Sequence, residues 1–370
     1  MTESSGDDGW PGPRTASGGH AVPWPEYDAA PGYLDTATLG LPSRAVADAV
    51  AFAVGDWRAG AASAPGYDSP VERAREGFAR LVGVSPRSVA LGASVSALVA
   101  LVAAGLPAGS EVLVADDEFT SLLFPLLQRE PDGVRVRAVP ARRLVDTVSS
   151  RTRLVAVSAV RSADGRVGDL EAIAEAAAVA GAWTLVDATQ ACGWLPLDAG
   201  SFDAVVCSGF KWIGAPKGAA FLALSDRLCD ASRPLAAGWF AGAQRWSTFY
   251  GGPLRLAEDA RRLDTAPAWL SFVGAAAALE QLGRLGPVRV RDHDLALADA
   301  AREGLGLPPS PSPIVALRGD GVGERVRRAG LRVAERAGCV RASFHLHNRW
   351  DDVERFVSAA REVRRGVAVR

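Results

Sequence analysis

The feature that most constrains this chain is the stretch 205–224, VVCSGFKWIGAPKGAAFLAL, in which two apolar runs flank a turn. The runs 204–207 and 219–224 have the continuous apolar character of buried strands. Of the 41 basic residues only Lys211 and Lys217 are lysines, and the others are arginines. Arginine cannot form an imine because its guanidinium keeps its proton, so Lys211, placed between two buried strands, indicates amine chemistry. Random survival in an arginine-rich composition is the alternative, and we expect Lys217 to be a solvated turn residue.

The length and composition indicate a globular protein of two domains. A chain of 370 residues is longer than one ordinary domain, and apolar residues make up 48% of it. Residues 1–30 are rich in Gly, Pro, Ser and Asp without periodicity, which predicts a disordered tail. We expect a large domain over 31–267, whose first residues join the second domain. The pattern of elements then changes, which predicts a small C-terminal domain over 268–370.

The charge balance and the cysteine spacing exclude several functional classes. The formal net charge is −1, so no global field attracts nucleic acid or an anionic membrane. No apolar run approaches the roughly 20 residues of a membrane-spanning helix, and the N-terminus lacks a signal-peptide core. The four cysteines show no CxxC spacing and are expected to be reduced thiols. These features predict a cytoplasmic protein without nucleic-acid or membrane partners.

Expected strands and helices alternate through the first two thirds of the chain. This alternation predicts a parallel, doubly wound α/β sheet, in which ligands bind at the carboxyl ends of the strands. Small and polar residues follow the expected strands, and their convergence on one edge carries more weight than any single motif. The strands are expected over 88–91, 111–115, 153–158, 183–186 and 204–207, and the residues at their ends are Gly92, Phe119, Ser158, Asp187 and Lys211.

The residues at this edge match the requirements of pyridoxal 5′-phosphate. A lysine that forms an imine needs an aldehyde partner, which this cofactor supplies. An ionised carboxylate such as Asp187 would keep the pyridine nitrogen protonated. Phe119 is suited to stack on the ring, and Gln190 is suited to contact its phenolic oxygen. The phosphate needs N–H and hydroxyl donors at a strand–helix turn, for which the candidates are Gly92, Ala93, Ser94 and Ser208.

Each candidate also has an alternative structural role. Asp187 could cap the next segment, Phe119 could belong to the core, Gln190 could be solvated, and 92–94 could be an ordinary tight turn. These alternatives require several coincidences on one sheet edge, so the sequence favours the cofactor site. No G-x-G-x-x-G that opens a helix, no GxxxxGK[ST] and no G-x-S-x-G motif competes with it.

Together these motifs resemble the class V aminotransferase family of fold-type I pyridoxal phosphate enzymes, over about residues 32–363. The family has an Asp-x-x-Gln motif like the one that begins at Asp187. It also has a Ser-x-His-Lys motif where this chain has Ser208-Gly-Phe-Lys211, and a cofactor-stacking segment similar to the one around Phe119. The resemblance implies a large domain with a mostly parallel, seven-stranded sheet, followed by a small α+β domain.

The resemblance also implies the remaining site residues. The pattern around Arg341 is similar to an epimerase-like segment whose arginine binds the substrate carboxylate, which implies a small amino-acid substrate. Ser162 stands where the family has an asparagine near the imine. Trp239 and Thr265 lie in segments similar to ones that contact a cofactor phosphate across a subunit boundary. These segments imply a homodimer with shared active sites.

Two histidines, His345 and His347, alternate at the end of a strand expected over 340–346. Such a pair could bind a metal. The chain has four histidines in all and no cysteine or carboxylate cluster around this pair, so we favour a substrate-pocket role and expect no metal.

The resemblance leaves the reaction open. One desulfurase branch carries a nucleophilic cysteine five residues after the carboxylate-binding arginine, where this chain has Leu346. We therefore expect β-elimination from a sulfur-containing or otherwise activated α-amino acid, with Lys211 as the acid–base group and His345 or His347 protonating the leaving group. Transamination and epimerisation are alternative reactions on this scaffold. A non-catalytic regulator is the alternative from another class, but it would be expected to lose Lys211 or Asp187.

Overall fold

The structure is a computed structural model that describes residues 24–29 and 31–361. Within these residues, seven strands form one large sheet: β1 (Val89–Gly92), β2 (Glu111–Ala115), β3 (Arg135–Val139), β4 (Thr152–Ser158), β5 (Trp183–Asp187), β6 (Ala204–Ser208) and β7 (Ala220–Leu224). Their order is β1-β7-β6-β5-β4-β2-β3. Neighbours from β6 to β3 run parallel, whereas β7 runs antiparallel to β6 and β1. The predicted seven-stranded, mostly parallel sheet is therefore confirmed.

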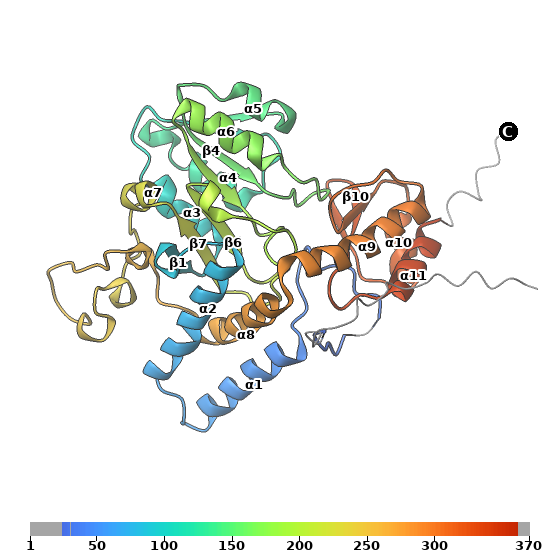
Figure 1. Ribbon diagram of the computed structural model, residues 1–370, viewed down its shortest axis with the longest axis horizontal. Helices are drawn as coiled ribbons and strands as arrows, with labels where there is room; N and C mark the ends of the chain where they lie inside the picture. The colour runs from blue at the N-terminus through green and yellow to red at the C-terminus, as the bar shows by residue number, and fades with distance from the viewer. Residues whose placement is uncertain (1–23, 30, 362–370) are drawn as a thin grey trace, which may run out of the picture.

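Helices cover both faces of this sheet (Figure 1). They are α1 (Arg44–Arg58), α2 (Asp68–Leu81), α3 (Val95–Ala103), α4 (Thr120–Leu127), α5 (Leu144–Thr147), α6 (Leu170–Ala180), α7 (Asp226–Ala231) and α8 (Trp269–Leu285). The alternating side chains of a central strand enter two separate cores. In β6, Val205 and Cys207 belong to the core that includes α2 and α8, whereas Val206 belongs to the core of α3 and α4. Burial on both faces explains the continuous apolar runs of the sequence.

A smaller antiparallel sheet lies beside the large one (Figure 1). In strand order β8-β10-β9, it contains β8 (Ile314–Leu317), β9 (Ala334–Arg336) and β10 (Cys339–Ser343), with α9 (Pro287–Leu305), α10 (Val322–Arg328) and α11 (Trp350–Arg361) around it. Leu34 joins its core with Phe344 and Phe356. Asp35 also forms a parallel bridge with Ser343, so the segment before α1 packs against the small sheet.

Two local predictions of the strands need correction. The strand expected over 340–346 ends at Ser343, so His345 and His347 lie beyond it rather than alternating along it. The edge strand β3 was not predicted, because its arginines at 135 and 137 interrupt the apolar pattern and most of its residues are not buried. Edge strands tolerate such charges because one side faces solvent.

Parts of the expected domain plan lie outside the described residues. Of the tail expected over 1–30, the structure describes only 24–29, where Trp24 Nε1 donates a hydrogen bond to the Leu346 carbonyl at 3.1 Å. The boundary expected between 267 and 268 stays a prediction. In the structure α8 packs its buried face beside α1 and α2.

Two further predictions concern membrane-spanning helices and the state of the cysteines. No helix in the described segments is long and apolar enough to cross a membrane. The four cysteines are buried free thiols.

Candidate active site

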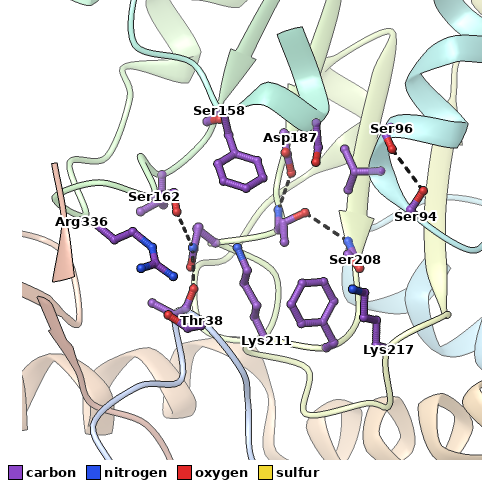
Figure 2. Close-up of a pocket in the computed structure, with 18 of the residues that line it drawn as sticks. Thr38, Ser94, Ser96, Ser158, Ser162, Asp187, Ser208, Lys211, Lys217 and Arg336 are labelled. Carbon is purple, nitrogen blue, oxygen red and sulfur yellow. Dashed lines mark hydrogen bonds between the residues drawn. The ribbon is translucent and has the colours of Figure 1, made fainter. Parts of the chain in front are cut away.

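A cavity of about 410 Å³ opens where the carboxyl ends of the large-sheet strands face the small sheet. Figure 2 shows its side chains around Lys211, with Ser162, Thr38 and Arg336 at one end and Ser94, Ser96 and Ser208 at the other. Most of the predicted site residues are therefore brought together. The cavity is lined by Ala37, Thr38, Ala93, Ser94, Val95, Ser96, Phe119, Ser121, Ser158, Val160, Ser162, Asp187, Thr189, Gln190, Ser208, Phe210, Lys211, Lys217, Arg336 and Arg341.

Lys211 follows the end of β6 and presents a buried amine to the cavity. The residue is 7% exposed, and its Nζ lies 5.5 Å from the centroid of the Phe119 ring and 5.7 Å from that of Phe210. Burial lowers the pKa of Lys211 to about 8, while the negative charge of Asp187 opposes this change and the positive charge of Arg341 adds to it. The amine can therefore exchange a proton near neutral pH, as a catalytic acid–base group must.

The backbone around Lys211 is fixed by contacts from several elements. Gly40 N donates to the Phe210 carbonyl at 2.9 Å, and a Cβ on Gly40 would lie 1.7 Å from the Lys211 carbonyl oxygen. Only glycine permits this approach. On the next residue, the Trp212 carbonyl lies 2.9 Å from His345 Nε2, and Trp212 Nε1 donates to Gln190 Oε1 at 2.8 Å. These contacts hold residues 210–212, the lysine segment, against both sheets.

Asp187 ends β5 beneath the cavity and is 5% exposed. Its Oδ1 accepts a hydrogen bond from the Thr189 N–H at 2.9 Å, and Thr189 Oγ1 accepts one from the Ser208 N–H at 3.1 Å. Burial raises the pKa of Asp187, and the Thr189 hydrogen bond and the positive charge of Lys211 oppose that rise. A cationic pyridinium nitrogen placed here would give this carboxylate the partner that favours its ionised form.

The turn from β1 into α3 provides donors at one end of the cavity. Ser94 caps α3 by accepting a hydrogen bond from the Ala97 N–H, and the first N–H groups of a helix have no intrahelical acceptor. A buried ion pair fixes the strand before this turn. Arg75 Nη2 lies 2.7 Å from Asp264 Oδ2, and Asp264 Oδ1 accepts a hydrogen bond from the Leu91 N–H at 2.8 Å.

The Phe119 ring is 46% exposed and lines the cavity at the start of α4. The preceding residue, Glu118, fixes this turn to the end of β4. Its carboxylate accepts hydrogen bonds from the Ser158 N–H at 2.8 Å and from Ser158 Oγ at 2.6 Å. Phe119 therefore has an open ring face on an anchored backbone, which suits a stacking role.

Arg341 reaches the cavity from β10 of the small sheet. Its guanidinium donates to the Ser162 carbonyl, to Ser162 Oγ at 3.2 Å and to Thr38 Oγ1 at 2.6 Å. Burial and the neighbouring charge of Arg336 lower the pKa of Arg341 to about 10, so the side chain remains a cation at neutral pH. No carboxylate among the described residues forms an ion pair with Arg341, which leaves it available to an anionic ligand.

Several predicted site residues do not line the cavity. Gly92 is buried in β1, where a Cβ would meet the Leu98 side chain at 2.8 Å. Trp239 packs among the aromatic rings of Trp246 and Phe249, and Thr265 donates its N–H to the Leu91 carbonyl. None of these residues lines the cavity of its own chain.

The two predicted histidines lie outside the cavity. His345 is buried between the Trp212 carbonyl and Asp294, whose Oδ2 is 2.7 Å from His345 Nδ1. His347 Nε2 lies 3.0 Å from the Tyr33 carbonyl, and burial lowers the pKa of His347 to about 4. Neither lines the cavity. Within residues 24–29 and 31–361, no three His, Cys, Asp or Glu side chains are grouped to hold a metal.

The structure adds cavity residues that the sequence did not identify. Thr38, Thr189 and Arg336 line the cavity, and so does Lys217, whose side chain is exposed as the sequence predicts. Thr189 could have been identified, since it lies inside the Asp-x-x-Gln motif. Thr38 and Arg336 come from distant segments with ordinary polar sequences, so no local signal marks them.

The cavity fits pyridoxal phosphate by its own chemistry. It holds one buried amine of lowered pKa, one buried carboxylate at Asp187, and an exposed face of Phe119. Ser208 is 5% exposed, and no described residue forms a hydrogen bond with its hydroxyl, which lies at the same end as Ser94. Lys211 would hold the aldehyde, Asp187 the ring nitrogen and Ser94 with Ser208 the phosphate.

Comparison with known proteins agrees with this chemistry. The family model for aminotransferase class-V matches residues 60–315. The uncharacterized aminotransferase YcbU of Bacillus subtilis (strain 168) is 32% identical over 307 residues, which cover 75% of this chain and 79% of that protein. Isopenicillin N epimerase of Streptomyces clavuligerus is 30% identical over 262 residues, which cover 62% of this chain and 63% of the epimerase.

Solved structures share the fold. The complex of the cystine C–S lyase C-DES with its product cysteine persulfide superposes with a TM-score of 0.79 at 20% identity, and the match covers 89% of this chain and 97% of the lyase. With the family match over 60–315, the buried amine of Lys211 and the carboxylate of Asp187, the chain belongs to the class V aminotransferase family of pyridoxal phosphate-dependent enzymes.

Proposed function

We propose that this enzyme catalyses β-elimination on an α-amino acid with sulfur at its β-carbon, which with one water molecule yields a thiol, pyruvate and ammonia. The observation that carries the proposal is the single buried amine of Lys211 in a cavity that also holds Arg341, a cation without a carboxylate partner among the described residues. Arg341 would bind the substrate carboxylate through its planar guanidinium. Lys211 would accept the proton of the substrate Cα–H bond.

The two residues have complementary protonation states for these tasks. With a pKa of about 8, part of the Lys211 population is a neutral amine near pH 7, whereas Arg341, at about 10, stays charged. When bound, pyridoxal phosphate supplies the electron sink for the pair left at the substrate Cα. The lowered exposure of Lys211 also excludes water that would compete for the proton.

The cavity favours a sulfur leaving group. Its described titratable side chains are Asp187, Lys211, Lys217, Arg336 and Arg341, so no histidine or cysteine lines it as an additional acid. A thiol has a pKa of about 8.5, and its thiolate therefore leaves with less assistance than an alkoxide. His345 and His347 have no part in this proposal because neither lines the cavity.

Transamination is the second candidate reaction. Lys211 alone could carry out its proton transfers, and one relative is called an aminotransferase. Epimerisation needs a second base opposite Lys211. The epimerase relative keeps that reaction as an alternative, for which Lys217 is the remaining amine of the cavity.

A panel of S-substituted cysteines distinguishes these reactions. We expect the enzyme to release pyruvate, ammonia and thiol without an added keto acid, because one acid–base lysine suffices for elimination. Turnover only when a keto acid is present would replace the proposal by transamination. Racemised substrate without other products would replace it by epimerisation.

Substitution of the carboxylate-binding arginine tests the substrate class. Arg341→Ala should lower kcat/KM by more than tenfold on the S-substituted cysteine that the native enzyme turns over best. Losing a buried charge-assisted pair costs about 2–5 kcal/mol. Arg318→Ala is the control, since Arg318 is an exposed arginine near the end of the neighbouring strand β8. Unchanged kcat/KM in Arg341→Ala, with cofactor absorbance retained, would refute a carboxylate contact at this residue.

We also propose a homodimer in which each site is completed by the partner subunit. Trp239 and Thr265 resemble cross-subunit contacts and do not line the cavity of their own chain. Large apolar side chains are exposed at Phe52 on α1 (73%) and in the segment of Trp239, where Tyr250 is 91% exposed. Exposed groups of this size are typical of interaction surfaces.

Light scattering measures the predicted dimer directly. We expect a mass of about twice 38.6 kDa for the cofactor-loaded protein. A monomer with full cofactor occupancy would contradict the shared site, because each cavity would then be complete on its own.

A further inference from the structure

Lys217 is the second lysine of the chain, and it lines the same cavity as Lys211. It lies in the turn between β6 and β7, where its carbonyl accepts a hydrogen bond from Ser271 Oγ at 2.8 Å. The next residue, Gly218, has a φ of +110°, a backbone conformation that side-chain-bearing residues rarely adopt. The turn that carries Lys217 is therefore held in place by α8 and by its own glycine.

Figure 2 shows the Lys217 side chain rising toward Ser208, on the side of the cavity that contains Ser94 and Ser96. Arg336 lies at the opposite end, across Lys211. The cavity is thus cationic at both ends. Asp187 is the only described acidic residue that lines the cavity. The end of the cavity where Lys217 lies therefore has no carboxylate of its own.

The polar groups around Lys217 are donors that lack a protein acceptor. Ser208 is 5% exposed and lines the cavity, and its hydroxyl forms no hydrogen bond with a described residue. Val95 and Ser96, the first two residues of α3, also line the cavity, and their N–H groups have no intrahelical acceptor. A cation, an open hydroxyl and a helix N-terminus together select an anion with several oxygens.

The neighbouring residue on the lysine segment contributes no such donor. Phe210 lines the cavity with an apolar ring, and Thr265 lies outside it. The end of the cavity that contains Ser94 and Ser208 therefore has one ammonium group among its described lining residues, that of Lys217. Arginine occupies every other Lys or Arg position of the chain, and both of its lysine side chains border this cavity.

We propose that Lys217 binds the phosphate of pyridoxal phosphate as a charge-assisted partner, with Ser208 and the N-terminus of α3. This inference rests on the cofactor dependence of the family and not on the proposed β-elimination. It assigns different tasks to the two lysines: Lys211 bonds the aldehyde, and Lys217 neutralises the phosphate.

Binding of two cofactor forms to the apoprotein tests this role. Titrations with pyridoxal phosphate and with pyridoxal, followed by the absorbance of the bound form, compare a ligand with the phosphate and one without it. In Lys217→Gln we expect the Kd for pyridoxal phosphate to rise by about tenfold or more and the Kd for pyridoxal to stay unchanged. Lys217→Arg should retain most of the affinity because it keeps the charge.

Arg80→Gln is the matched control, since it removes one exposed positive charge from α2 at a residue that does not line the cavity. It should leave both affinities unchanged. The proposal is overturned if Lys217→Gln binds pyridoxal phosphate as tightly as the native chain. Equal weakening for both ligands would also overturn it, because Lys217 would then support the site only structurally. Neither result depends on which bond of the substrate is broken.

Discussion

The burial of the Lys211 amine at the end of β6 is the constraint on which the rest of the site depends. Removing an ammonium from water disfavours its charge, and only the carboxylate of Asp187 among the cavity residues opposes that effect. A pKa of about 8 instead of about 10.4 makes the neutral amine roughly two hundred times more abundant at pH 7. An exposed lysine would lack this property.

The same amine links the two sheets of the molecule. The backbone on either side of Lys211 is held by Gly40, which contacts the Phe210 carbonyl, and by His345 after β10, which contacts the Trp212 carbonyl. His345 is in turn held by Asp294 on α9. Because Arg341 also comes from β10, the small sheet fixes the catalytic backbone and supplies the cation for the substrate end. A functional cavity therefore requires both parts of the fold.

The sequence predicts the regular parts of this arrangement because they have a local signal. Continuous apolar runs identify β6 and β7, and the residues that follow the strands converge on one edge by topology alone. Lys211, Asp187, Phe119 and Ser208 are placed in the cavity as the pattern predicts.

Contacts between distant segments have no such signal. Arg336 and Thr38 reach the cavity from segments almost 300 residues apart, and their neighbours do not distinguish them from solvated residues. The histidine pair shows the converse error. A strand prediction carried past Ser343 placed His345 on a surface of the pocket, whereas the chain turns there and buries it against Trp212. Lys217 is exposed on its turn as predicted, and only the fold shows that the same turn borders the cavity.

Chemical trapping of the cofactor tests the central claim most directly, because the chain has only two lysines. The cofactor-loaded protein is reduced with borohydride, digested and analysed by mass spectrometry. The account predicts that the pyridoxyl label lies on the peptide that contains Lys211, while Lys217 remains unlabelled. A label on Lys217, or an equal distribution over both lysines, would contradict the assignment of Lys211 as the cofactor-binding amine.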